Sequence, residues 1–179
     1  MSSEHFVISD THFGHENIIR YCKRPFTSVE EMDETMVDNW NSVVRPQDHV
    51  YHLGDVTIER GSKNSQQAQR FVRLIRRLNG HKRLILGNHD HYPVQVYLEA
   101  GFEKVRGTGR WLEGCLLSHY PVHPQSLGRA RVNIHGHIHE KPDYKPVLAV
   151  DRLVPYINVS VEVTFYRPTA LTDILATRV

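Results

Sequence analysis

Short apolar runs alternate with amphipathic stretches along this chain, and most apolar runs end on acidic, amide or imidazole residues. His5-Phe6-Val7-Ile8 is rich in β-branched residues and predicts a buried strand that ends at Ser9-Asp10. Similar patterns predict strands over residues 48–53, 82–86, 111–118 and 131–134. Apolar and polar residues alternate over 156–166, which predicts one or two more strands.

Helical spacing of apolar residues fills most of the intervals between these strands. Behind the capping box Ser28-x-x-Glu31, apolar residues recur at that spacing and predict a helix over 28–44. A second amphipathic helix is expected over 64–78, with arginines mostly on its outer face, and shorter helices over 16–21, 94–100 and 171–177. Without repeats or linkers, this order indicates one α/β domain over residues 1–179.

Composition narrows the classes of function. The net charge of +2 is too mild to imply nucleic-acid binding, which usually needs a strongly basic face. The 13 histidines are unusual, and imidazole is the commonest metal ligand. The two cysteines, Cys22 and Cys115, form no C-x-x-C pair, so neither a zinc ribbon nor a disulfide framework is expected. Because no leader or membrane segment is seen either, we expect a cytoplasmic protein without membrane attachment.

Polar groups at the predicted strand ends have the chemistry of a site for divalent cations. In α/β sheets, ligands collect beyond the carboxyl ends of the strands. Two cations roughly 3.5 to 4 Å apart can clamp a phosphate and lower the pKa of a bridging water. Oxygen or nitrogen ligands are offered at these ends by Asp10, His12, Asp55, Asn88, His119, His137 and His139.

Five motifs carry a resemblance to a known family. In order along the chain they are Asp10-x-His12, Gly54-Asp55, Gly87-Asn88-His89-Asp90, His119 and Gly136-His137-x-His139. This set resembles that of the calcineurin-like metallophosphoesterase superfamily, which implies a single domain with a four-layer α/β/β/α sandwich. Asp-Thr-His-Phe-Gly-His at 10–15 and Asn158-Val159-Ser160-Val161 look more narrowly like a small prokaryotic and phage-type branch.

The resemblance also assigns roles to residues. It implies that Asp10, His12 and His139 hold one metal ion, that Asn88, His119 and His137 hold a second, and that Asp55 bridges both. His89 would be the general acid that protonates the leaving group, and Asp90 would orient its ring. Imidazoles and carboxylates without a thiolate suit Mn, Fe, Zn or Ni, and the family favours Mn²⁺.

The expected reaction is hydrolysis of a small phosphodiester, such as a nucleotide-type diester, by a metal-bridging hydroxide. The alternative is a phosphomonoesterase for small molecules or proteins. A nuclease acting on nucleic-acid ends is a weaker reading because it needs an extended binding face. A scaffold without turnover is also weaker, because no ligand is missing. Candidates for substrate contact are His15, Asn17 and Arg129. No obligate protein partner is expected.

Overall fold

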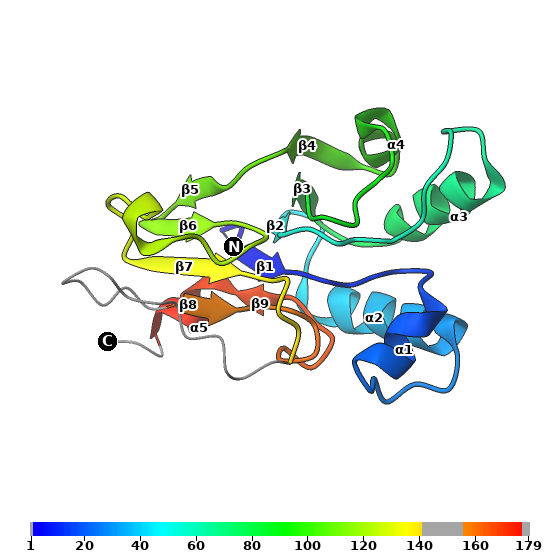
Figure 1. The fold of residues 1–179 in the computed structure, drawn as a ribbon, viewed down its shortest axis with the longest axis horizontal. Helices are drawn as coiled ribbons and strands as arrows, with labels where there is room; N and C mark the ends of the chain where they lie inside the picture. Colours follow the sequence, from blue (N-terminus) through cyan, green and yellow to red (C-terminus); the bar gives the residue numbers. More distant parts are fainter. Residues whose placement is uncertain (1, 141–155, 177–179) are drawn as a thin grey trace.

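Two β-sheets form the centre of the protein, as the computed structural model of residues 2–140 and 156–176 shows (Figure 1). The first sheet has the order β4 (Phe102–Arg106), β3 (His81–Ile85), β2 (His49–His52), β1 (His5–Ile8) and β9 (Thr169–Ala170). Strands β1 to β4 are parallel, and β9 runs antiparallel to β1. The second sheet has the order β5 (Arg110–Leu112), β6 (Cys115–Leu117), β7 (Val132–His135) and β8 (Tyr156–Asn158).

Most helices pack on one face of the first sheet, and the second sheet and the last helix pack on its other face. The helices are α1 (Glu16–Tyr21), α2 (Val29–Val43), α3 (Gln66–Ile75), α4 (Val94–Glu99) and α5 (Leu171–Ala176), with a 3-10 helix η1 (Pro124–Ser126). A hydrophobic core lies on each face of the first sheet, and successive residues of β1 point to opposite cores. Phe6 and Ile8 pack with α2, α3 and α4, and Val7 packs with the second sheet.

The predicted mixed α/β fold with two sheets is therefore confirmed. On the far side of the second sheet, Leu116 packs under Leu127 and Ala130, on the segment that carries η1. Among the described residues, no helix is long and apolar enough to cross a membrane.

Three details differ from the sequence prediction. The strand expected over 111–118 is a hairpin of β5 and β6, because Glu113 and Gly114 adopt φ values of 48° and 80° that suit a tight turn. Strand β4 was not predicted, since this edge strand exposes most of its side chains. Beyond β8, residues 161–166 form turns and not a strand, and β9 is too short to show a pattern. Thr177, the predicted end of the last helix, lies outside the described residues.

Candidate metal centre

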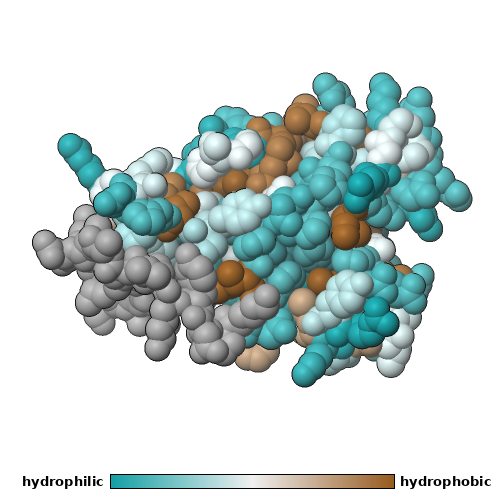
Figure 2. All heavy atoms as spheres, viewed as in Figure 1, coloured by the Kyte–Doolittle hydropathy of each residue, from teal (hydrophilic) through white to brown (hydrophobic). Residues whose placement is uncertain are grey.

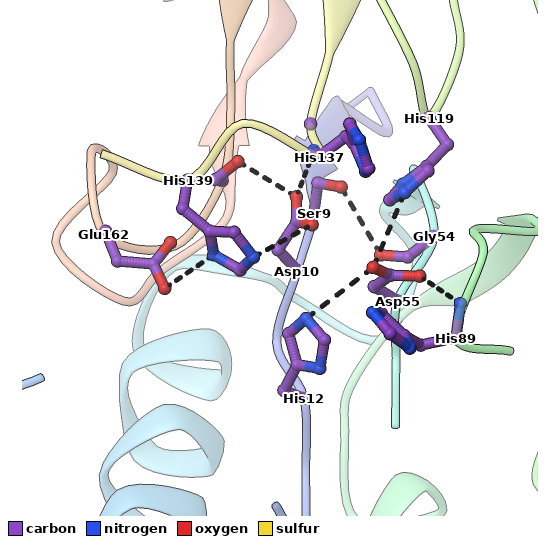
Figure 3. Close-up of polar contacts among 12 residues, drawn as sticks. Ser9, Asp10, His12, Gly54, Asp55, His89, His119, His137, His139 and Glu162 are labelled. Atoms are coloured by element: carbon purple, nitrogen blue, oxygen red, sulfur yellow. Dashed lines mark hydrogen bonds and ion pairs between the residues drawn. The ribbon is translucent and has the colours of Figure 1, made fainter. Parts of the chain in front are cut away.

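The loops that follow β1, β2, β3, β6 and β7 meet at one edge of the two sheets and bring the predicted ligands together (Figure 3). Left-handed backbone is concentrated in these loops. Positive φ values occur at Asp10 (59°), His12 (52°), Asp55 (55°), His137 (73°) and His139 (49°). Such backbone costs roughly 1–3 kcal/mol per non-glycine residue and persists only where the surroundings hold it, as is common at functional sites.

Two glycines leave room for the carboxylates. A Cβ atom on Gly87 would overlap the Asp55 carboxylate, and a Cβ on Gly136 would overlap the Asp10 carboxylate and Ser9. Both loops therefore need glycine for close approach, which gives the Gly-Asn and Gly-His pairs of the sequence a steric reason.

The first triad joins Asp10, His12 and His139, whose ligand atoms all lie within 4.8 Å of one another. Asp10 is fully buried, and its Oδ2 accepts hydrogen bonds from the His137 amide and the Ser160 hydroxyl, both at 2.9 Å. Among the described residues, its Oδ1 atom has no hydrogen-bond partner, nor has either ring nitrogen of His12. Buried polar atoms without hydrogen-bond partners are costly, and a cation bound here would satisfy Asp10 Oδ1 and one ring nitrogen of His12.

The second triad joins Asp55, His119 and His137, again within 4.8 Å. His119 donates from Nδ1 to the Leu53 carbonyl at 2.8 Å, which leaves Nε2 as the ligating atom. That Nε2 lies 2.9 Å from Asn88 Oδ1 and 3.5 Å from Asp55 Oδ2. Asp55 Oδ2 also lies 3.7 Å from His12 Nε2, so it sits between the two triads, where a bridging carboxylate belongs.

Electrostatics agree with a site built for cations. Burial, followed by the negative charge of Asp10, raises the pKa of Asp55 to about 8. Burial lowers the pKa of His119 to about 4 and holds that of His12 well below its usual range, so both imidazoles are neutral and able to ligate. Burial also lowers the pKa of His139, but hydrogen bonds with Cys22 and Glu162 and the charges of Glu162 and Asp10 raise it to about 10.

The two predicted catalytic residues have different surroundings. His89 donates its backbone amide to Asp55 Oδ1 at 2.8 Å, and its ring centroid lies 5.6 Å from that of His12, beside the site. Asp90 accepts hydrogen bonds of 2.8–2.9 Å from the backbone amides of Asp55, Val56 and Gly87. Its carboxylate therefore joins two ligand loops, and its predicted role in orienting the His89 ring stays a prediction.

The candidate substrate residues are not brought together. His15 lies beside the first triad, with its ring centroid 5.5 Å from that of His12, and its buried Nδ1 has no hydrogen-bond partner in the part of the chain that the structure describes. Asn17 is exposed in the first turn of α1. Arg129 is exposed just before β7, whereas His137 follows the other end of that strand, so the structure places Arg129 away from the metal centre.

Three residues beside the site were missed as site residues. The Tyr120 ring lies 4.5 Å from the His137 ring and 4.9 Å from the His119 ring, centroid to centroid, and is 48% exposed. Buried Arg24 and Glu162 form an ion pair that contacts the first triad. Tyr120 follows His119 directly and could have been noticed; Arg24 and Glu162 meet only through the fold.

This sandwich and its clustered ligands are those of a metal-dependent phosphoester hydrolase. The calcineurin-like phosphoesterase family matches residues 6–155, so the chain belongs to that family, whose members typically bind two divalent metal ions.

Two relatives in sequence support the assignment. The chain is 41% identical over 167 residues to the uncharacterized protein MJ1445 of Methanocaldococcus jannaschii, with 93% of this chain and 86% of that protein covered. It is 34% identical over 170 residues to the gene 66 protein of Mycobacterium phage L5, with 78% of each covered. These matches fit the prokaryotic and phage-type branch that the sequence resembles.

Solved structures share the fold. A protein of unknown function from Aquifex aeolicus, AQ665, has a TM-score of 0.75 and 28% identity, with 98% of this chain and 100% of that chain covered. Pseudomonas putida nuclease MPE has a TM-score of 0.52 and 19% identity, with 75% of this chain and 61% of that chain covered, a likeness of fold alone.

Proposed function

We propose that this protein is a binuclear phosphodiesterase that hydrolyses small phosphodiesters, including those of nucleotide type, with Mn²⁺ as the preferred ion. The position of Asp55 Oδ2 carries this proposal, since it lies 3.7 Å from His12 Nε2 and 3.5 Å from His119 Nε2 and so faces both triads. The unpartnered atoms of Asp10 and His12 and the nitrogen and oxygen donor set fit transition-metal ions.

Each residue then has a defined task. Asp10, His12 and His139 would hold one ion, Asn88, His119 and His137 would hold the other, and Asp55 would contact both. When bound, such an ion pair clamps the phosphate and lowers the pKa of water, so that hydroxide is available near neutral pH. His89 would donate a proton to the leaving oxygen.

Two features of the site favour a diester over a monoester. A general acid helps most when the leaving group is a poor one, such as the alkoxide of an alkyl or nucleoside diester. Tyr120, half exposed beside His119 and His137, offers an aromatic face on which a planar leaving group can stack.

Three of the four arginines in α3 and at its end contact other groups of the protein. Arg77 pairs with Glu34, Arg76 donates to the Glu99 carbonyl, and Arg70 lies 3.9 Å from Glu59. Figure 2 shows a surface that is largely hydrophilic over the middle of the molecule, with hydrophobic residues in separate small patches. These contacts favour a small substrate over an extended nucleic acid.

A substrate panel tests the proposal. Phosphomonoesters, linear alkyl and aryl diesters, and 2′,3′- and 3′,5′-cyclic nucleotides would be assayed with added Mn²⁺, with chelator, and with the Asp55→Asn variant. We expect diesters to be hydrolysed with the higher kcat/KM, and expect chelator and Asp55→Asn to abolish turnover. A clear preference for monoesters would refute the diesterase assignment, and turnover that survives chelation would refute the metal-dependent mechanism.

A further inference from the structure

Alternate polar residues at the end of β8 and just after it reach toward the first triad. Asn158, Ser160 and Glu162 are each two residues apart, and Val159 and Val161 between them are buried in the hydrophobic cores. In extended backbone, successive side chains point to opposite sides and alternate ones share a side, and Ser160 continues the strand through a bridge to Ser9. The sequence pattern N-x-S-x-E thus presents its polar side to the metal centre.

Ser160 and Asn158 contact the first triad directly. The Ser160 hydroxyl lies 2.9 Å from Asp10 Oδ2 and 2.7 Å from Asn158 Oδ1, and Asn158 Oδ1 also accepts from the Ser160 amide at 3.0 Å. Asn158 donates from Nδ2 to the backbone carbonyl of His139. These contacts fix which Asp10 oxygen stays free and hold the left-handed backbone of His139 in place.

Glu162 orients the His139 ring. His139 Nδ1 donates to Glu162 Oε1 at 3.0 Å, which leaves Nε2 facing Asp10 Oδ1 at 4.0 Å (Figure 3). A carboxylate on the far nitrogen of a ligating histidine fixes its tautomer and raises its basicity as a ligand.

Arg24 completes the arrangement from the segment after α1. Its Nε and Nη2 atoms donate to Glu162 Oε1 at 2.9 and 2.7 Å. Its Nη1 and Nη2 atoms donate to the carbonyls of Thr11 and Asp10 at 2.8 and 2.7 Å. Both side chains of this ion pair are at most 4% exposed. A buried ion pair needs such hydrogen bonds to offset desolvation, and here they come from the loop that carries the ligands.

The metal ligands that these four residues contact belong to the first triad. They reach Asp10 and His139, whereas the second triad is held by other groups: the Leu53 carbonyl on His119, and Asp90 and His89 on Asp55. We propose that Arg24, Asn158, Ser160 and Glu162 are positioning residues that set the cation affinity of the Asp10–His12–His139 triad separately from that of the other triad. This inference rests on the two-metal site of the proposed function.

The test isolates each triad in turn. In a His119→Ala background the first triad is intact, and in a His12→Ala background the second triad is intact. Glu162→Gln is added to each, and Mn²⁺ binding to the metal-free protein is measured by calorimetry. Removing such a support typically lowers metal affinity roughly 10- to 100-fold, and we expect that loss in the His119→Ala background alone.

A matched control and a second variant guard against a general loss of structure. Glu113→Gln removes a carboxylate from another Glu–His pair, with His5, whose Nδ1 lies 3.0 Å from Glu113 Oε1, and should leave Mn²⁺ affinity unchanged. Ser160→Ala removes the hydroxyl on Asp10 without touching the buried ion pair, and should also weaken binding in the His119→Ala background alone.

The outcomes separate the two claims. Unchanged affinity for Glu162→Gln and Ser160→Ala in the His119→Ala background would overturn the positioning role, as would equal losses in both backgrounds. If the unmodified protein bound no Mn²⁺ at all, the two-metal site of the proposed function would fall, and this assignment with it.

Discussion

Replacing His52 should change how the stability of the metal-free protein depends on pH. His52 is buried at the end of β2, where Nε2 lies 3.0 Å from the Thr11 hydroxyl and Nδ1 accepts from the Gly54 amide at 3.2 Å. Because the Thr11 hydroxyl itself donates to the Val56 carbonyl, the ring must donate from Nε2 and accept at Nδ1, as only the neutral form can. Burial, with a smaller contribution from His119, lowers the pKa of His52 to about 3.

The sign and size of the effect follow from linkage. The pKa of His52 is near 6.5 in the unfolded chain, so between pH 6.5 and pH 3 the unfolded state binds one more proton and stability falls as the pH falls. Between pH 7 and pH 5, His52 alone should remove about 2 kcal/mol from the free energy of unfolding.

Urea unfolding in chelator, followed by circular dichroism, measures this dependence. His52→Gln should lose about 2 kcal/mol of the difference in unfolding free energy between pH 7 and pH 5. His91→Gln, which changes an exposed histidine, should keep the full difference. If the unfolding free energy of His52→Gln depended on pH as that of the unmodified protein does, the assignment of a neutral His52 with two hydrogen bonds would be refuted.

Three further predictions concern the metal centre. Gly136→Ala should weaken Mn²⁺ binding and lower the free energy of unfolding in urea by about 1–3 kcal/mol, because its Cβ would overlap the Asp10 carboxylate. Gly107→Ala is the control, since its Cβ would meet no side chain or more distant backbone of the described residues within 4 Å, and it should leave Mn²⁺ binding unchanged. His89→Gln should bind Mn²⁺ normally but lose about 10²–10⁴-fold in kcat on alkyl diesters and far less on aryl diesters; equal losses would contradict an acid role. Asp55 and His139, with pKa values raised to about 8 and 10, carry protons at pH 7 in the metal-free protein. Mn²⁺ binding should therefore release protons and tighten from pH 6 to pH 8, and calorimetry in two buffers showing no release would count against this.

Much of the fold follows from local patterns, and the exceptions have local causes. Strands β1, β2, β3 and β7 end at ligands, so their apolar runs and the polar residues after them predicted both elements and site. The Glu113-Gly114 turn was not predicted because the residues on both sides of it are apolar. Strand β4 was not predicted because this edge strand exposes most of its side chains.

The supporting groups around the site could not be predicted in the same way. Arg24 and Glu162 are 138 residues apart and meet only because the segment after β8 returns to the segment after α1. The role of Asp90 was predicted from its neighbour His89. Its hydrogen bonds, however, come from the backbone amides of Asp55 and Val56, which only the fold brings close. A ligand can be recognised from its type and spacing, whereas a supporting contact depends on long-range packing.

The central claim is that two cations share Asp55, and counting bound metal tests it most directly. Metal-free protein would be saturated with Mn²⁺, freed of excess ion, and its metal content per chain measured for the unmodified protein and for Asp55→Asn. The account predicts two ions per chain in the unmodified protein and a lower count in Asp55→Asn. One ion or fewer in the unmodified protein, or an unchanged count of two in Asp55→Asn, would contradict it.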